Sequence, residues 1–448
     1  AATTANYNVG IGYAALTATT TGADNTAVGS GAMESNTTAV NNTAVGRAAL
    51  QANTTGTNNT ALGAAALDAL TDADFNTAVG KDALSADTLG SKSTAIGTGT
   101  LGAQNFTSAT DTFNTVVGYF AGIANTTGVQ NTFIGGLSGD ANTTADNNTA
   151  VGYASLTANT TGSENTAVGQ GALDANTTAS GNTAVGSDAL TANTTGASNV
   201  AVGKNALEAN TTGTVNVAIG RDAATSLTTG TGNTAIGKDA YKNTTASSNN
   251  VCIGYLAGDL SGMGSNNTII GTNADAQQAS ESKEIVLGFE CKGVGSNYFV
   301  FGTGSGNDRV YNPYTSDNSW TRVSDERYKK EIQDNTDCGL GFINDLRPVT
   351  FKWKEKSELD PSFPDYNAED TNNAHPNKLY GLIAQEVKEA MDKHNITDFG
   401  GWNSITTKDH TQQGVSQEMF IHPLIKAVQE LSAKVEELEN KKCKCNEE

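Results

Sequence analysis

The chain has 448 residues and a formal net charge of −20, and its two parts differ in composition. Residues 1–288 contain 20 Asp/Glu against 8 Lys/Arg, residues 289–448 contain 27 against 19, and all six prolines and three tryptophans follow residue 312. Because both parts are acidic, neither offers a basic surface to neutralise a nucleic acid backbone. No apolar run approaches the roughly 20 residues of a membrane-spanning helix. We expect neither nucleic acid binding nor membrane insertion.

Residues 1–288 repeat a seventeen-residue unit, Asn-Thr-Ala-Val-Gly-x-x-Ala-Leu-x-Ala-Asn-Thr-Thr-Gly-x-x. Its fifth-position glycine, called here the anchor glycine, recurs every 17 residues from Gly12 to Gly288, apart from one interval of 21 between Gly97 and Gly118. Repeats built from helical pairs need about 33 residues or more. The short period therefore predicts a β-solenoid in which each unit forms one coil.

Three columns of the repeat predict how the coils pack. The residue before the anchor glycine is aliphatic in all seventeen units, from Ile11 to Leu287, and we expect this column to be the buried core. Two residues before the glycine, most units carry Ala, which is small enough for another chain to approach; Cys252 in this column is expected to be a buried apolar residue. Four residues before the glycine, Asn occurs in fifteen units and predicts a stacked amide ladder.

So small a coil buries little apolar surface against an ordering cost of about 1–2 kcal/mol per residue. We expect identical coils to associate through the Ala face, which would remove the deficit. The repeats resemble the heads of trimeric bacterial adhesins and the stalks of viral fibres. At ~4.8 Å per coil, sixteen intervals predict a rod of ~77 Å.

The long interval between Gly97 and Gly118 coincides with a group of aromatic residues. An outward bulge there would be a candidate receptor contact, because exposed aromatic side chains mark binding sites. The alternative is a packing adjustment where Val116 and Phe133 replace alanines. The candidate receptor residues are Phe106, Phe113, Tyr119 and Phe120.

Residues 289–323 carry short β-prone runs separated by Gly, Asn and Pro, and predict a small β-rich collar that caps the solenoid. The runs are Tyr298 to Phe301, Arg309 to Tyr311 and Trp320 to Val323. The Asn-Thr-Thr triplets from Asn36 to Asn210 match a glycosylation sequon, but the repeat produces them automatically.

Residues 324–448 carry three motifs in order: Ser324-Asp-Glu-Arg-Tyr-Lys-Lys-Glu-Ile332, Leu346-Arg-Pro-Val-Thr-Phe-Lys-Trp353 and Tyr380-Gly-Leu-Ile-Ala-Gln-Glu-Val387. Together they resemble the S74 peptidase family, a self-cleaving intramolecular chaperone at the C-terminus of bacteriophage tail fibres and tailspikes. The resemblance implies an α+β module in which Ser324 is the nucleophile and Lys329 its partner. The cleaved bond would join Val323 to Ser324.

The proposed Ser/Lys pair also makes chemical sense. A hydroxyl needs a base to become a nucleophile, and a lysine amine is a base only where burial disfavours the ammonium form. Lys330 is an adjacent competitor, and only the family spacing favours Lys329. Any activity would be a single autoproteolytic turnover.

A helix is expected over residues 381–393, and a longer one over residues 418–441. Valine and leucine at the core heptad positions of the long helix favour two strands, whereas the family resemblance implies three. The seam comprises Ile421, Leu424, Val428, Leu431, Val435 and Leu438.

We expect no cofactor and no metal site. The four histidines, His375, His394, His410 and His422, lack metal-ligand spacing, and Cys443 and Cys445 alone supply too few ligands. Interchain disulfides between these two cysteines are conceivable, although a reduced tail is the simpler expectation.

The expected protein is mainly β: a solenoid of residues 1–288, a collar of residues 289–323 and an α+β chaperone of residues 324–448 ending in a coiled coil. We expect a homotrimeric tail or surface fibre on a virion, binding a glycan or protein receptor on a host cell and attached through a preceding N-terminal part. Two alternatives remain: a trimeric adhesin on a bacterial surface, and an ice-binding solenoid with a threonine ladder.

Overall fold

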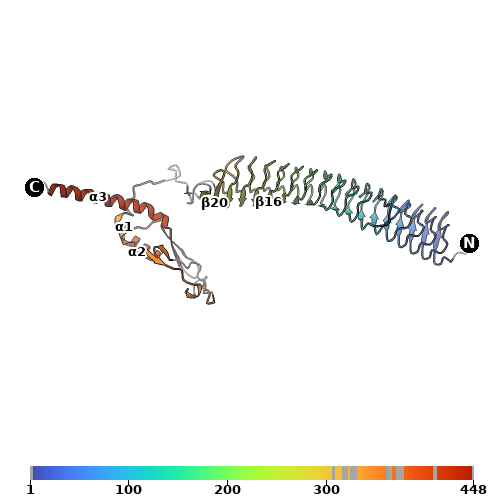
Figure 1. Cartoon of the computed structure of the whole chain (residues 1–448), viewed down its shortest axis with the longest axis horizontal. Coiled ribbons are helices and arrows are strands. Elements are labelled where there is room, and N and C mark those ends of the chain that lie inside the picture. The colour runs from blue at the N-terminus through green and yellow to red at the C-terminus, as the bar shows by residue number, and fades with distance from the viewer. Residues whose placement is uncertain are drawn as a thin grey trace. The chain divides into compact units, whose positions relative to one another are not determined.

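The computed structural model describes residues 4–304, 308–314, 321–322, 330–359, 361, 366–369, 378–406 and 411–445, with the side chains of 321–322, 405–406, 411–412 and 443–445 left out. The chain divides into two compact units, residues 1–328 and 329–448. The first is mainly β and the second holds the helices (Figure 1). Each unit is described by itself.

The first unit is the predicted β-solenoid, and each coil contributes one three-residue strand to a continuous sheet. The coil strands are β1 (Val9–Ile11), β2 (Thr26–Val28), β3 (Thr43–Val45), β4 (Thr60–Leu62), β5 (Thr77–Val79), β7 (Thr94–Ile96), β9 (Thr115–Val117), β10 (Thr132–Ile134), β11 (Thr149–Val151), β12 (Thr166–Val168), β13 (Thr183–Val185), β14 (Val200–Val202), β15 (Val217–Ile219), β16 (Thr234–Ile236), β17 (Val251–Ile253), β18 (Thr268–Ile270) and β19 (Ile285–Leu287).

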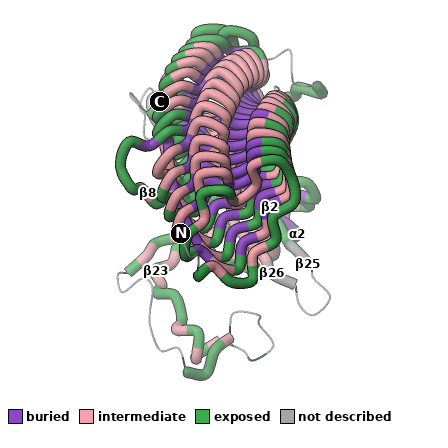
Figure 2. The backbone as a smooth tube through the Cα atoms, turned by 90° about the vertical axis from the view of Figure 1, so that its right-hand side faces the viewer, coloured by how far each residue is buried: buried purple, intermediate pink, exposed green. Residues whose placement is uncertain are grey.

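Neighbouring coil strands pair in parallel, so that each residue lies beside its counterpart in the next repeat. Thr166 pairs with Thr183, for example, seventeen residues later. The one longer step joins Thr94 of β7 to Thr115 of β9. The additional residues form a second small parallel pair, β6 (Gly90–Ser91) with β8 (Thr110–Asp111), and the loop at β8 stands out from the stack (Figure 2).

The anchor glycines are required by the close approach of successive coils. Gly46 has φ +145°, a conformation that residues with a side chain rarely adopt. A Cβ built at Gly46 would also collide with the carbonyl oxygen of Gly63, the anchor of the next coil. Both constraints recur at successive anchors, which explains why this column of the repeat is glycine.

The expected assignment of the core columns is wrong: the alanine column is buried, and the aliphatic column points outward. Ala184 is fully buried, whereas the neighbouring Val185 is 37% exposed. Successive strand residues point to opposite faces, so one column must lie inside and the other outside. The narrow coil interior accepts the smaller residue. Figure 2 shows the buried segments running inside the stack.

The remaining core comes from two further columns of the coil. The Ala three residues after the anchor glycine and the Leu after it are also buried, as at Ala189 and Leu190. Cys252, in the inner strand column, is fully buried, which confirms its expected role as an apolar core residue. The solenoid interior is therefore filled mostly by alanine, with one larger residue per coil.

The asparagine ladder before the strands is confirmed. The backbone N–H of Asn182 donates to Oδ1 of Asn165 at 3.0 Å, and Nδ2 of Asn165 donates to the carbonyl of Ala179 at 2.8 Å. A second buried ladder, which we did not predict, uses the Asn of Asn-Thr-Thr: Nδ2 of Asn176 donates to Oδ1 of Asn159 at 2.9 Å. The triplets are thus structural, since these asparagine side chains lie inside the coil.

Residues after Gly288 continue the same sheet before reversing it. Strand β20 (Tyr298–Gly302) pairs in parallel with β19, and β21 (Arg309–Pro313) and β22 (Thr321–Arg322) then add in antiparallel order. Glu284, which replaces a ladder asparagine, accepts hydrogen bonds from the N–H groups of Val294 and Gly295, both at 2.7 Å. The end of the ladder is therefore closed by a buried carboxylate.

The second unit combines helices and two small sheets. Its elements are α1 (Leu340–Asp345), β23 (Val349–Phe351), the 3₁₀ turn η2 (Lys356–Glu358), β24 (Leu379–Gly381), α2 (Ala384–Lys393), β25 (Trp402–Thr406), β26 (Thr411–Val415), the 3₁₀ turn η3 (Gln417–Phe420) and α3 (Ile421–Cys445). Strand β23 pairs with β24 and β25 with β26, both antiparallel. Phe342 of α1 lies at the centre of the core, with Val387 and Met391 of α2 and Phe420 of η3.

Candidate functional site

The residues proposed for self-cleavage, Val323, Ser324 and Lys329, lie outside the described residues. The first described residue after them is Lys330, whose side chain is 90% exposed and 3.9 Å from Glu331. A lysine acts as a base only when burial disfavours its ammonium form. Lys330 is not buried in the single chain, so in that state its amine is not in the environment that a base needs.

The four aromatic residues of the long interval separate into two groups. Phe106 is only 7% exposed, and its ring occupies the space that a Cβ at Gly90 would need. Phe113 and Tyr119 are 52% and 59% exposed. Phe120 is half-buried, with its ring centroid 4.2 Å from that of Tyr119. Phe106 therefore packs the coil, whereas Phe113 and Tyr119 are available at the surface.

The packing adjustment also occurs at this place. Phe133 is fully buried in the inner column where other coils carry Ala. The Leu positions beside it are occupied by Gly122 and Gly139, and a Cβ at Gly139 would lie 2.8 Å from the Phe133 ring. One large residue in place of an alanine is thus compensated by glycines in place of leucines. The packing adjustment is therefore present at Phe133, whereas receptor contact by Phe113 and Tyr119 stays a prediction.

A buried polar network replaces the ladders at the insertion. The carboxylate of Asp87 accepts hydrogen bonds from Nε2 of Gln104 at 2.7 Å and from the N–H of Gly90 at 3.0 Å. Gln104 continues to Asn114, which donates to its Oε1 at 2.9 Å. Burial raises the pKa of the Asp87 carboxyl above its ordinary value, and the hydrogen bonds oppose that rise.

The outward face of the coil strands is a surface that the sequence interpretation missed. We call outer stripe the two columns one and three residues before each anchor glycine, such as Val168 and Thr166. Its aliphatic column is half-buried or exposed from Ile11 to Leu287. The signal was available in the sequence: a ladder asparagine must point inward, and strand alternation then sends the residue three positions later outward.

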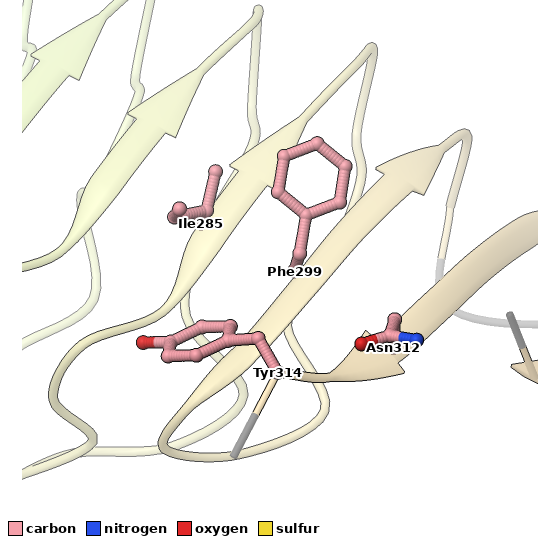
Figure 3. Close-up of a pocket in the computed structure, with 4 residues that line it drawn as sticks. All are labelled: Ile285, Phe299, Asn312 and Tyr314. Atoms are coloured by element: carbon pink, nitrogen blue, oxygen red, sulfur yellow. The ribbon is translucent and has the colours of Figure 1, made fainter. Parts of the chain in front are cut away.

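The outer stripe becomes more apolar where the solenoid ends. Ile285 and Phe299 replace the threonines of the outer column, and with Asn312 and Tyr314 they line an open hollow of about 450 Å³. Figure 3 shows their side chains over adjacent strands of the sheet. The hollow is a continuation of the stripe.

The second unit exposes the predicted seam of α3. Each seam residue is exposed, and Ile421, Leu424, Ile425 and Val428 line a shallow apolar hollow on the helix. At the C-terminal end of α2, Nζ of Lys393 and Nε2 of the capping residue His394 meet the carboxylate of Asp345 in α1 at 2.7 and 2.5 Å. These hydrogen bonds lower the pKa of the Asp345 carboxyl. His394 thus fixes a helix end.

Two searches of the described residues concern metals and membranes. Among them no group of three His, Cys, Asp or Glu side chains is placed to hold a metal ion. Within the same residues, no helix has the length and apolar character needed to cross a bilayer.

Comparison with known proteins gives one match. The family model described as the chaperone of endosialidase, Peptidase_S74, matches residues 324–396. Neither a curated protein nor a solved structure matches the chain. The match begins at Ser324 and covers α1, α2 and the β23–β24 pair. A chaperone-of-endosialidase region following a β-solenoid fits a protein of the tail-fibre type.

Proposed function

We propose that this chain is the shaft of a homotrimeric fibre on a virion surface, assembled with the help of its C-terminal module. The observation that carries the proposal is the outer stripe. It presents a half-buried or exposed aliphatic residue in every coil along the whole solenoid. Monomeric soluble proteins rarely expose a continuous apolar surface of that extent. The stripe is an interaction surface.

The period of the stripe identifies its partner. A partner covering it must present matching apolar groups once per coil over seventeen coils. A second copy of this solenoid has the same rise per coil and the same length. Association of identical coils is also the usual way in which thin repeat proteins bury an apolar face. The chains therefore associate through the outer stripe, and not through the alanine column, which lies inside each coil.

The exposed seam of α3 supports the same assembly. Helices with apolar residues alternately three and four positions apart associate into coiled coils. The six seam residues are exposed in the single chain. Three chains is the number implied by the S74 resemblance, whereas the heptad favours two. The module would bring the chains together while their solenoids fold.

The junction would then release the module. The Oγ of Ser324 attacks the carbonyl carbon of Val323 and forms an ester, Lys329 takes the hydroxyl proton, and the amine of Ser324 leaves with a proton. Water then hydrolyses the ester to leave a carboxylate on Val323. Because the bond lies within the reacting chain, positioning gives a large rate advantage, and each chain reacts once.

Sedimentation of the full chain tests the assembly. For the uncleaved Ser324→Ala chain we expect a particle of three times the 46.0 kDa chain mass, and for the parent a trimer of whichever fragments stay associated. Val168→Lys with Val202→Lys places charges in the outer stripe and should dissociate or misassemble the particle. Thr161→Lys with Thr195→Lys adds the same charges at exposed corners of the coil and should leave it trimeric. A parent chain that stays monomeric at micromolar concentration contradicts the proposal.

Two other functions remain as alternatives. A trimeric adhesin of a bacterial surface would share the solenoid, and the S74 match favours the virion. An ice-binding solenoid is supported by one observation: the threonine column lies on the outer face of a regular parallel sheet. Trimerisation through that face would cover it. Inhibition of ice recrystallisation by a monomeric chain would favour this alternative.

A further inference from the structure

The residues directly after the anchor glycines form a half-buried or exposed column along the solenoid. None of the seventeen is acidic, although residues 1–288 hold 20 Asp/Glu against 8 Lys/Arg. We call this column the ridge. Its members are Tyr13, Ser30, Arg47, Ala64, Lys81, Thr98, Tyr119, Gly136, Tyr153, Gln170, Ser187, Lys204, Arg221, Lys238, Tyr255, Thr272 and Phe289.

The ridge changes character near the insertion. Outside this part, three of the five ridge cations pair with the carboxylate of the following residue: Lys81 with Asp82 at 2.6 Å, Arg221 with Asp222 at 3.2 Å and Lys238 with Asp239 at 2.5 Å. Between Lys81 and Lys204, the ridge carries no charge. The column that follows it also loses its carboxylates between Asp82 and Asp188, where it reads Gly99, Phe120, Leu137, Ala154 and Gly171.

Two tyrosines form the centre of this uncharged section. Tyr119 and Tyr153 are 59% and 60% exposed and lie two coils apart, or roughly 9.6 Å at the usual spacing of parallel strands. Gly136 lies between them, and a Cβ there would be 3.7 Å from Cδ2 of Tyr153. The Tyr153 ring thus lies across the intervening coil, and the surface between the rings is shallow.

Of the two glycines beside the rings, one is explained by a ring. Gly136 lies outside the left-handed region of φ, and its ridge counterparts carry Lys, Arg or Tyr, so the backbone does not require glycine there. The ring of Phe120 covers Gly99, where a Cβ would collide with it. The absence of a side chain at Gly99 lets the Phe120 ring lie over the backbone, whereas a Cβ at Gly136 would make an ordinary contact with the Tyr153 ring.

The solenoid does not need tyrosine at either position. Other coils form the same turn with Ser187, Lys204 or Arg221 on the ridge. Tyr13, Tyr255 and Phe289 place other aromatic rings on the ridge, but only Tyr119 and Tyr153 have a glycine on the coil between them. Phe113 adds a further exposed ring just before β9, with Nζ of Lys92 5.2 Å from its ring centroid. Its positive φ belongs to the repeat, because Phe75 and Gln130 adopt the same conformation in their coils.

We propose that the surface formed by Tyr119, Phe120, Gly136 and Tyr153, called here the tyrosine platform, binds a neutral oligosaccharide lying along the rod. This inference rests on the proposed function, because a fibre exposes the ridge to a host surface. The C–H faces of sugar rings stack on aromatic rings, and tyrosine adds a hydroxyl for hydrogen bonding. The spacing of the two rings suits alternate sugars of a linear chain.

Because the tyrosine platform carries no charged side chain, it favours uncharged sugars over carboxylated or sulfated ones. Carboxylated or sulfated sugars would need the cations that the ridge carries only beyond Lys81 and Lys204. The neighbouring ridge residues Thr98 and Gln170 offer a hydroxyl and an amide, which bond sugar hydroxyls without charge. A protein partner is expected to fill pockets around its anchor residues. The shallow platform suits a flat, hydroxyl-rich chain better.

Affinity electrophoresis of the full chain tests the proposal, with mixed-linkage β-glucan, galactomannan and dextran as neutral probes and polygalacturonate as a charged one. At least one neutral polymer should retard the parent, with little change between low and high salt. Tyr119→Ser with Tyr153→Ser should weaken that retardation at least tenfold. Tyr255→Ser removes an exposed ridge tyrosine beside Lys238 and should bind like the parent.

Three results would overturn the proposal. They are retardation by none of the neutral polymers, retention of binding by the double variant, and loss of the trimer in the double variant, which would assign the platform to the subunit interface. Sedimentation of the same samples separates this proposal from the fibre assignment. A trimer that binds no neutral polymer refutes the platform alone, whereas a monomer that binds in a tyrosine-dependent manner refutes the fibre alone.

Discussion

Glu430 of α3 accepts a hydrogen bond from the backbone N–H of Leu340, the first residue of α1, at 2.8 Å. Ninety residues of sequence separate the two. Gly339, which precedes α1, offers no side-chain cap, so the carboxylate of the long helix takes that role. The helix that carries the exposed seam is thereby tied to the core of the module.

Replacing Glu430 by Ala should lower the free energy of unfolding of the module by about 0.5–2 kcal/mol, because the α1 N–H loses its acceptor. Urea unfolding of the full chain followed by tryptophan fluorescence measures it, since residues 1–312 contain no tryptophan. Glu439→Ala on the exposed part of α3 serves as the control. Equal stability of the two variants would show that the Leu340 contact contributes nothing.

Adjacent substitutions test the orientation of the coil strands. Ala184→Val adds two methyl groups inside the coil and should destabilise the solenoid by about 1–3 kcal/mol. Val185→Ala removes apolar surface from the outer stripe and should weaken association while leaving the coil intact. Circular dichroism melting at several protein concentrations distinguishes them. A larger loss of single-coil stability for Val185→Ala would restore the aliphatic column as the core.

The asparagine ladder should be intolerant of interruption. Asn165→Ala removes the acceptor for the N–H of Asn182 and one of the two amide donors to the carbonyl of Ala179, which keeps the bond from Nδ2 of Asn176. Each buried group left unsatisfied costs about 1–3 kcal/mol. Thermal melting should show a large drop for this variant and little change for Thr161→Ala at an exposed corner. Similar melting of both would mean that solvent replaces the ladder bonds.

The pH dependence of solenoid stability should carry a contribution from Asp87. Its folded pKa is raised by burial above the unfolded value of 3.8, so the folded state binds the proton more tightly. The contribution is therefore most favourable below pH 3.8 and declines as pH rises through the raised pKa. Asp87→Asn should remove this decline. The difference in unfolding free energy between parent and variant, measured from pH 3 to 8, should vary with pH; a constant difference would contradict the assignment.

The junction chemistry predicts the masses of the chains after assembly. Ser324→Ala and Lys329→Ala should each leave a full-length chain of 46.0 kDa that still trimerises. The parent should yield fragments divided between Val323 and Ser324, and so should the control Lys330→Ala. Mass spectrometry of the assembled protein measures the masses of the intact and cleaved chains. Intact parent chain alone would remove the protease activity while leaving the chaperone role in place.

A truncated chain tests the chaperone role by itself. If the C-terminal module guides assembly, residues 1–323 expressed alone should give a poor yield of trimer compared with the full chain. Refolding both from denaturant and comparing trimer yield by sedimentation makes the comparison. Equal yields would show that the solenoid finds its partners without the module.

Much of the architecture could be predicted because the sequence of residues 1–288 repeats at a fixed interval of seventeen residues, with one exception. The anchor glycines from Gly12 to Gly288 define the coils, since only glycine permits the close approach of Gly46 to Gly63. The ladder asparagines define the strand starts, and the spacing of Ile421 to Leu438 defines the long helix. These features depend on local conformation and on neighbours a fixed distance apart in the chain.

The tertiary structure decided which residues face inward and which distant residues meet. Ala184 and Val185 differ in burial because the width of a closed coil admits only the smaller side chain, and a hydrophobicity pattern does not contain that width. Phe106 and Phe113 are equally apolar, yet the path of the inserted loop buries one and exposes the other. The bond from Leu340 to Glu430 likewise depends on packing between helices far apart in sequence, which no local pattern encodes.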